Sequence, residues 1–312
     1  MKTYITIDGG TTNTRVTLVK SDGTRDTVKL SIGARKSMDG NGDLKAAIRD
    51  AITALLSRHS LSSGDVSRIL ASGMITSEYG LCALPHVEAP AGIPELHAAM
   101  HETVLPEVSE IPFVFVRGVK VVGASVYDTD MMRGEESELY GITDGTEGHS
   151  LYVLPGSHSK LIETDREGRI SHFSTMLTGE MLAAIATDTI LRDAVDLSVS
   201  EFDEKKLLEG AEYALTRGYS EALFKVRVLK NFFDGTPVEV YSFFLGAILS
   251  SEIKAIAESD APRVVIGGRK QLKEATALLL SRYSDKEIVP LSEETVDASS
   301  SRGVIRIYEY GA

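Results

Sequence analysis

The chain has 312 residues, 43% of them hydrophobic, which is enough for two globular domains with hydrophobic cores. Its 45 acidic residues outnumber its 33 basic ones and give a net charge of -12, which argues against a protein that coats nucleic acid or an anionic membrane. With one cysteine, no secretory signal and no apolar run of the ~20 residues that span a membrane, we expect a cytoplasmic protein without internal disulfides.

The first half of the chain is rich in short β-type runs. Strands are predicted where such runs end in turn residues, over 4–10, 14–23, 25–33, 68–74 and 112–122. Between Asp43 and Leu56, apolar residues recur at the spacing of an amphipathic helix, and 134–141 is also expected to be helical. Residues 80–110 contain several prolines and are expected to be irregular.

The second half repeats this plan. Strands are predicted over 150–156, 159–165, 170–176, 263–268 and 286–291, and helices from 178 to about 258, over 270–281 and near the end of the chain. The apolar helix around 243–249 is expected in the core rather than in a membrane. Three strands followed by alternating helices and strands in each half predict an α/β fold of two domains, 1–120 and 121–312, each with a mixed sheet.

Two glycine-containing turns occupy the same place in the two halves, between the first and second predicted strands. Glycine allows close backbone approach, and successive amides with hydroxyl side chains form a cradle for phosphate. Lys160 adds a cation, and Asp8 is suited to hold a hydrated Mg²⁺. Plain turns have a similar composition, so it is the matching positions that favour phosphate binding. The phosphate-binding residues expected are Asp8, Gly10, Thr11, Thr12 and Asn13 in the first turn and Gly156, Ser157, His158, Ser159 and Lys160 in the second.

Several blocks of the chain resemble one enzyme family. The DGGTTN turn, the second turn and the late VVIGG strand end are similar to the actin-like ATPase and sugar-kinase superfamily. Within it, MMRGEESELYG, LYVLPGSHSK, TMLTGE, LFKVR and FFLGAILSSEI resemble the 2-dehydro-3-deoxygalactonokinase family and follow its order. The resemblance implies two ribonuclease-H-like domains with an interdomain cleft for the nucleotide.

The resemblance also implies an activity. A kinase of this family would use ATP and Mg²⁺ to phosphorylate the C6 hydroxyl of 2-dehydro-3-deoxy-D-galactonate, a sugar acid of galactonate breakdown. Gly9 and Leu161 stand where the family usually has tryptophan, and this chain contains no tryptophan. Phosphate chemistry does not need those rings, but their absence leaves the identity of the sugar acid open.

Acidic residues open the helix predicted over 134–141. Glu135 and Glu136 follow a glycine at its start, where the helix dipole favours carboxylates, and such acids are also typical of ordinary capping. A sugar kinase needs one carboxylate to accept the proton of the attacking hydroxyl. The resemblance points to Glu135 first and Glu136 second, with Lys160 offsetting the developing charge. Arg133 is suited to pair with the sugar-acid carboxylate, or equally with one of the two glutamates.

Further ligand contacts are expected from the resemblance and from position. Three of the residues, 178–180, lie at the start of the helix that begins near 178, and Ser77 follows the strand predicted over 68–74. A late glycine pair suits a backbone that passes close to adenine, although any strand-to-helix turn also uses glycine. The contacts expected with the sugar acid are Ser77, Thr178, Gly179 and Glu180, and those with adenine are Gly267 and Gly268.

Two other functions fit the same sequence. Another kinase of the superfamily would act on a different sugar acid or on an amino sugar. A non-catalytic actin-like module would bind nucleotide without sugar-stimulated turnover. In each case the partners are small molecules rather than nucleic acid or membrane, and the oligomeric state stays open, a homodimer being one option.

Overall fold

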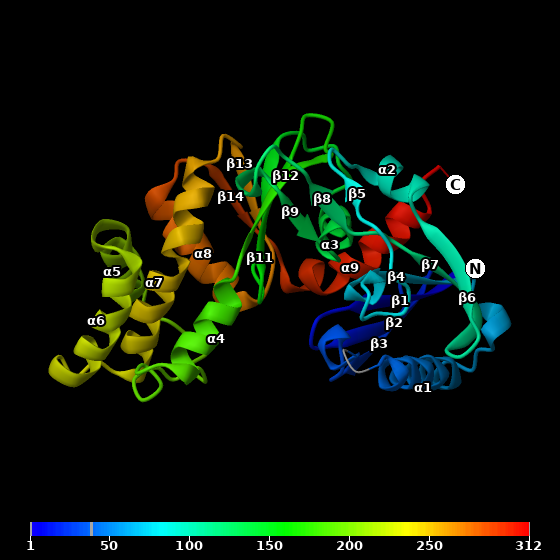
Figure 1. Cartoon of the computed structure of the whole chain (residues 1–312), viewed down its shortest axis with the longest axis horizontal. Helices are drawn as coiled ribbons and strands as arrows, with labels where there is room; N and C mark the ends of the chain where they lie inside the picture. Colours follow the sequence, from blue (N-terminus) through cyan, green and yellow to red (C-terminus); the bar gives the residue numbers. More distant parts are fainter. Residues whose placement is uncertain (1, 38–39, 312) are drawn as a thin grey trace. The chain divides into compact units, whose positions relative to one another are not determined.

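A computed structural model describes residues 2–37 and 40–311. The chain divides into two compact units (Figure 1). The first consists of Met1–Gly148, Asp165–His172 and Glu294–Ala312, and the second of His149–Thr164 and Phe173–Glu293. The boundary predicted at residue 120 lies inside the first unit, because the short strands and the helix that follow it pack with that unit.

The first unit is built on a six-stranded mixed sheet. Its strand order is β3-β2-β1-β4-β7-β6, with bounds β1 Thr3–Gly9, β2 Thr14–Lys20, β3 Arg25–Leu30, β4 Arg68–Gly73, β6 His101–Leu105 and β7 Ser109–Phe115. The first three strands are antiparallel, β4 is parallel to β1 and β7 is parallel to β4. Helix α1 (Gly42–Arg58) packs its apolar residues, such as Ile48 and Leu55, into the core with Ile5 and Val16. The amphipathic helix predicted after Asp43 is therefore confirmed.

The second unit carries a sheet of the same plan. Its order is β12-β11-β10-β13-β14, with bounds β10 Ser150–Leu154, β11 Ser159–Thr164, β12 Ile170–Met176, β13 Arg263–Ile266 and β14 Glu287–Pro290. The residues 170–172 of β12 are assigned to the first unit. As in the first unit, the first two strands form an antiparallel hairpin and the fourth runs parallel to the first. The strand order 3-2-1-4-5 therefore occurs twice, which confirms the duplicated α/β fold with ribonuclease-H-like topology.

Helix α7 (Pro237–Glu258) is the buried axis of the second unit. It starts after Thr236, whose hydroxyl accepts the amide of Glu239 while Pro237 takes the first helical position. Figure 1 shows α5 and α6 beside α7. Although α7 is long and apolar enough to cross a membrane, 78% of its most apolar window is buried, as expected for a core helix. The helices of this unit are α4 Thr178–Asp188, α5 Glu204–Arg217, α6 Tyr219–Phe232, α7 Pro237–Glu258 and α8 Lys270–Tyr283.

Two regions differ from the prediction. The segment 80–110 is more ordered than expected, because it contains β5 (Val87–Glu88), β6 and the helix α2 (Ile93–Ala98). Pro94 lies in the first turn of α2, and the Glu95 carboxylate accepts the amide of Gly92 just before the helix. The run 112–122 is not one strand. It breaks before β8 (Val119–Val121), which pairs with β5 and with β9 (Asp130–Met132) in a separate three-stranded sheet.

Glycine pairs allow two helix crossings in which backbones touch. In the second unit, a Cβ added at Gly210 of α5 would lie 2.0 Å from Phe243 O, and one at Gly246 of α7 would lie 2.0 Å from Leu207 O. In the first unit, α3 (Glu135–Ile142) and α9 (Glu293–Tyr308) cross in the same way. A Cβ at Gly303 would lie 1.7 Å from Ser137 O. No side chain fits at these positions, so glycine is required at both helix crossings.

The α5–α7 crossing predicts a large effect from a single methyl group. Gly246→Ala should lower the free energy of unfolding by about 1–3 kcal/mol, since the new Cβ must push two helices apart. Gly42→Ala in α1 is the matched control, because a Cβ there meets nothing within 4 Å. The control should keep or slightly raise stability in urea titrations. Equal midpoints for the two variants would contradict the crossing.

Candidate functional site

The turn between β1 and β2 is held by backbone contacts. Gly10 N donates to Asn13 O at 2.8 Å, which closes the turn. The carbonyls of Gly10 and Thr11 accept the amides of Ala34 and Arg35 at 3.1 and 2.9 Å. These bonds leave the side chains of Thr12 and Asn13 exposed on the outer side of the turn, where a ligand can reach them.

Asp8 lies one residue before the end of β1, in an acidic setting. Its Oδ2 accepts Arg15 Nη1 at 3.0 Å. Burial raises the pKa of Asp8, and Arg15 opposes this rise. The pKa of Glu138 in α3 is raised to about 8 by burial and then by the nearby charge of Asp8. Sequence reasoning missed Glu138, although its position three residues after Glu135 places both on one side of α3.

Three glycines bring the start of α3 to the ends of β1 and β4. Gly73 has φ +87° and a Cβ there would lie 2.4 Å from Gly9 O. Gly134 has φ +111° and a Cβ there would lie 3.1 Å from the Cα of Gly73. The sequence therefore fixes the first turn of α3 beside the strand that carries Asp8.

The two glutamates predicted as bases have different surroundings. Glu136 is fully buried and both of its carboxylate oxygens accept Gly134 N, at 2.9 and 2.8 Å. Burial, and then the charge of Glu135, raise its pKa to about 8. Glu136 thus caps its own helix, whereas Glu135 is only half-buried. Of the two, Glu135 is the more exposed residue, although its Oε2 is buried.

Arg133 orders the loop that follows β4. Its Nη1 donates to the carbonyl and the hydroxyl of Thr76, both at 2.9 Å, and its Nη2 donates to Leu84 O at 2.7 Å. Ser77 Oγ in turn donates to Met74 O at 2.7 Å. Arg133 and Ser77, two of the residues predicted to contact the sugar acid, therefore have architectural partners within this loop.

The second turn, between β10 and β11, is more open. Gly156 N approaches Ser159 Oγ at 3.4 Å, and a Cβ at Gly156 would meet only His158 O, at 3.8 Å. Lys160 follows in β11 and is buried; its ammonium donates to Thr175 Oγ1 at 2.5 Å and lies 6.0 Å from the ring centre of Phe173. The turn thus has a face on which backbone amides and small side chains are available to an anion.

The start of α4 packs onto this turn. A Cβ at Gly179 would lie 2.4 Å from Gly156 O, so only glycine permits this approach. Glu180 N donates to Ser157 O at 3.2 Å, and His158 Nε2 pairs with Glu180 Oε1 at 3.2 Å. The structure therefore brings together the turn residues and the α4 residues that were predicted separately.

Glu252 of α7 is a functional candidate that sequence reasoning missed. Its carboxylate is buried and accepts hydrogen bonds from the hydroxyls of Thr178 and Ser159, which join the start of α4 to the second turn. Burial raises its pKa, and the two hydroxyls oppose this. The available signal was one acid within the otherwise apolar FFLGAILSSEI segment.

The late glycine pair lies beside the same turn. Gly267 N donates to Val153 O at 2.8 Å because β13 runs parallel to β10. Gly268 has φ +77°, and a Cβ there would lie 2.7 Å from Pro155 O. The second unit therefore assembles the turn, the start of α4 and the Gly267–Gly268 pair at the carboxyl ends of two parallel strands, where ligands bind in α/β sheets.

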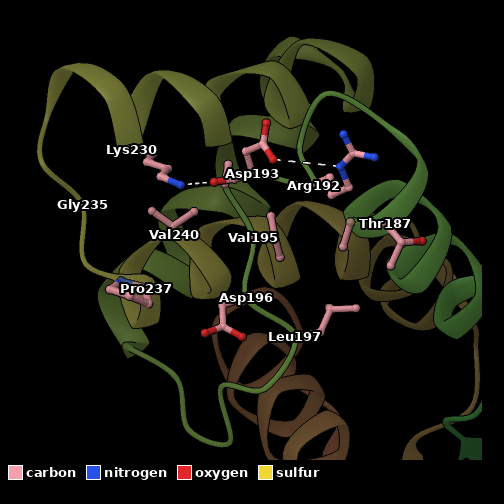
Figure 2. A pocket seen from close by; sticks show the side chains of 12 residues that line it. Thr187, Arg192, Asp193, Val195, Asp196, Leu197, Lys230, Gly235, Pro237 and Val240 are labelled. Carbon is pink, nitrogen blue, oxygen red and sulfur yellow. Dashed lines mark hydrogen bonds and ion pairs between the residues drawn. The ribbon is translucent and has the colours of Figure 1, made fainter.

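A cavity of about 600 Å³ lies elsewhere in the second unit. Figure 2 shows Lys230, Asp193 and Pro237 around it, with Lys230 Nζ bonded to the carbonyl of Asp193. Its wall residue Val240 precedes Glu252 by twelve positions of α7, about 18 Å along the helix axis. This cavity is thus separate from the second turn.

Residues 8–303 match the family described as 2-keto-3-deoxy-galactonokinase. The chain belongs to this family. A probable 2-dehydro-3-deoxygalactonokinase of Rhizobium meliloti is 29% identical over 199 residues, which are 62% of this chain and 59% of that protein. The 2-dehydro-3-deoxygalactonokinase of Escherichia coli is 26% identical over 257 residues, 82% of this chain and 80% of that protein. The family predicted from the sequence is thereby confirmed.

Solved structures support the fold. A putative 2-dehydro-3-deoxygalactonokinase from Sinorhizobium meliloti has a TM-score of 0.78 at 23% identity, over 98% of this chain and 99% of that one. Component A of the (R)-2-hydroxyglutaryl-CoA dehydratase of Acidaminococcus fermentans has a TM-score of 0.52 at 12% identity, over 100% of each chain. At these identities the likeness concerns the fold alone.

The buried carboxyl of Glu136 predicts a pH-dependent stability. Its folded-state pKa of about 8 lies above its ordinary value of 4.5, so its contribution is complete below pH 4.5 and is lost as the pH rises through about 8. Glu136→Gln should therefore flatten the fall in unfolding free energy between pH 5 and 9 by about 2–4 kcal/mol.

The measurement is urea unfolding of nucleotide-free and metal-free protein across this pH range. The exposed Glu110→Gln is the control and should keep the wild-type slope. If the unfolding free energy of Glu136→Gln fell with pH as steeply as that of the wild type, the result would contradict the raised pKa of Glu136, and its carboxyl would be ionised in the folded protein.

Proposed function

We propose that this chain transfers the γ-phosphoryl group of ATP to the C6 hydroxyl of 2-dehydro-3-deoxy-D-galactonate. The observation that carries the proposal is the family match over 8–303, which includes both strand-end turns and the start of α3. Two relatives with this activity in their names support the choice of substrate. The expected cytoplasmic location and the oligomeric state stay predictions.

The second turn supplies the groups that the phosphates of ATP need. Gly156 leaves room for close approach, since the space beside its Cα is open and an added Cβ would meet only His158 O, at 3.8 Å. The exposed Ser157 hydroxyl and the nearby amides are neutral donors, whereas the buried Ser159 hydroxyl is used by Glu252. Lys160 supplies positive charge in a buried setting. Gly268, packed against Pro155, would leave the adenine a flat backbone surface.

The first unit offers oxygen ligands that suit Mg²⁺. Burial raises the pKa of both carboxyls, Asp8 and Glu138, and the charge of Asp8 raises that of Glu138 further. A divalent cation relieves such repulsion. We assign Asp8 as the residue that would hold hydrated Mg²⁺, as predicted. When bound, the ion would neutralise charge on the phosphates. Arg15 keeps the Asp8 carboxylate in place.

Glu135 is the preferred base. Glu136 is committed to Gly134 N through both oxygens and is fully buried, so it cannot reach a substrate hydroxyl without unravelling the start of α3. Glu135 stands on the same first turn but is half-buried. It would accept the proton of the C6 hydroxyl as that oxygen attacks phosphorus. Arg133 would act by ordering the loop near this site rather than by binding the sugar carboxylate.

The division of roles between the two glutamates is testable. Glu135→Gln should lower kcat by about 10³-fold or more, because no carboxylate then accepts the proton, while the affinity for ATP changes little. Glu136→Gln is the matched variant and should keep kcat within about tenfold, since an amide can still accept Gly134 N. A coupled ADP-release assay measures both. The reverse ranking would assign the base to Glu136.

The substrate assignment has its own test. ADP release should be fastest with 2-dehydro-3-deoxygalactonate, slower with its gluconate epimer and near background with a sugar that lacks the carboxylate. Higher kcat/KM with an amino sugar or another sugar acid would favour a different kinase of the superfamily. ATP binding without turnover on any of these compounds would instead favour a non-catalytic nucleotide-binding module.

A further inference from the structure

A histidine and two carboxylates lie close together at the end of the second sheet that is opposite the second turn. The three are His149, Glu163 and Asp260, and their ligand atoms all lie within 4.8 Å of one another. His149 precedes β10, Glu163 is the penultimate residue of β11, and Asp260 precedes β13. Since β10 leads to the second turn at its other end, about 16 Å of strand separates the cluster from that turn.

The spacing of these atoms fits a small cation. His149 Nε2 and Asp260 Oδ1 are 3.4 Å apart. Two ligands that bind a tetrahedral Zn²⁺ at about 2.0–2.1 Å are separated by about 3.3–3.4 Å. A nitrogen and two carboxylate oxygens from three separate segments thus lie within 4.8 Å of one another, and the His149–Asp260 pair already has the spacing of two zinc ligands.

The residues around the cluster hold its ligands in place. Ser259 Oγ donates to Glu163 Oε1 at 2.8 Å, which is the kind of outer partner that orients a metal-binding carboxylate. Lys286 Nζ donates to the carbonyls of Ser259 and Ala261 on either side of Asp260. The Lys286 ammonium therefore holds the turn that carries Asp260 through two backbone carbonyls.

We propose that His149, Glu163 and Asp260 bind a divalent first-row transition-metal ion, of which Zn²⁺ is the test case. An imidazole ligand favours these ions over Mg²⁺ and Ca²⁺, which prefer oxygen ligands alone. Three protein ligands leave one tetrahedral position for water. The ion would tie the starts of β10 and β13 to the end of β11 and so stabilise the second unit. It is separate from the Mg²⁺ that accompanies ATP.

The test uses untagged full-length protein, stripped with EDTA and free of nucleotide. Isothermal titration with Zn²⁺ should find a site in the wild type that is lost in His149→Ala and weakened at least tenfold in Asp260→Asn. Zn²⁺ should also raise the thermal midpoint of the wild type but not of His149→Ala. Asp285→Asn, an exposed acid in the loop after α8, is the matched control and should bind Zn²⁺ as the wild type does.

Two results would overturn the proposal. One is equal Zn²⁺ affinity and stoichiometry in the wild type and in Asp260→Asn, a change at an exposed side chain that the fold should tolerate. The other is an anomalous-diffraction map of Zn²⁺-soaked crystals without a peak between the three residues. The Asp8→Asn variant distinguishes Zn²⁺ bound near Asp8 from Zn²⁺ bound at His149, because it should lose only the former. Kinase activity is not needed for any of these readouts.

Discussion

The close approach of one backbone to another, at positions where only glycine fits, is the constraint on which both candidate sites depend. In the first unit Gly73 lies over the carbonyl of Gly9, and in the second Gly179 lies over the carbonyl of Gly156, each at 2.4 Å from an added Cβ. A side chain at either place would separate a helix or loop from the strand-end turn beside it. The turns hold their shape because their neighbours touch them directly.

Buried carboxylates complete this arrangement in both units. Glu136 accepts the amide at the start of α3, and Glu252 accepts the hydroxyl of Thr178 at the start of α4. Burying a carboxyl is costly, and the raised pKa of each group reflects that cost. Each acid holds the start of a helix that carries candidate ligand contacts. We infer that these two acids position the residues that contact the ligands.

Local patterns were sufficient to predict much of the fold. Short β-rich runs that end at glycine, such as those before Gly10 and Gly156, are recognisable without tertiary context. The edge strand β6 and the short helix α2 were missed, because prolines and polar residues mask them and pairing with β7 decides the strand. The division into units by contacts places residues 121–148 with the first unit, and local sequence signals do not carry that information.

The candidate site divides in the same way. The positions of the two turns and of the Gly267–Gly268 pair could be read from the sequence because these features are local, and their roles in ligand binding stay predictions. Glu252 and Glu138 could not, because their importance arises from residues far away in sequence, namely Thr178 and Asp8. The different roles of Glu135 and Glu136 depend on which side of one helical turn is buried, and two adjacent identical residues give no sequence signal for that.

The most direct test of the central claim is the affinity of Gly179→Ala for Mg·ATP. If the close contact of α4 with the second turn builds the phosphate site, isothermal titration should find at least about tenfold weaker binding than in Gly42→Ala, with both proteins folded by circular dichroism. Wild-type affinity in a folded Gly179→Ala protein would contradict the claim and place the phosphates elsewhere.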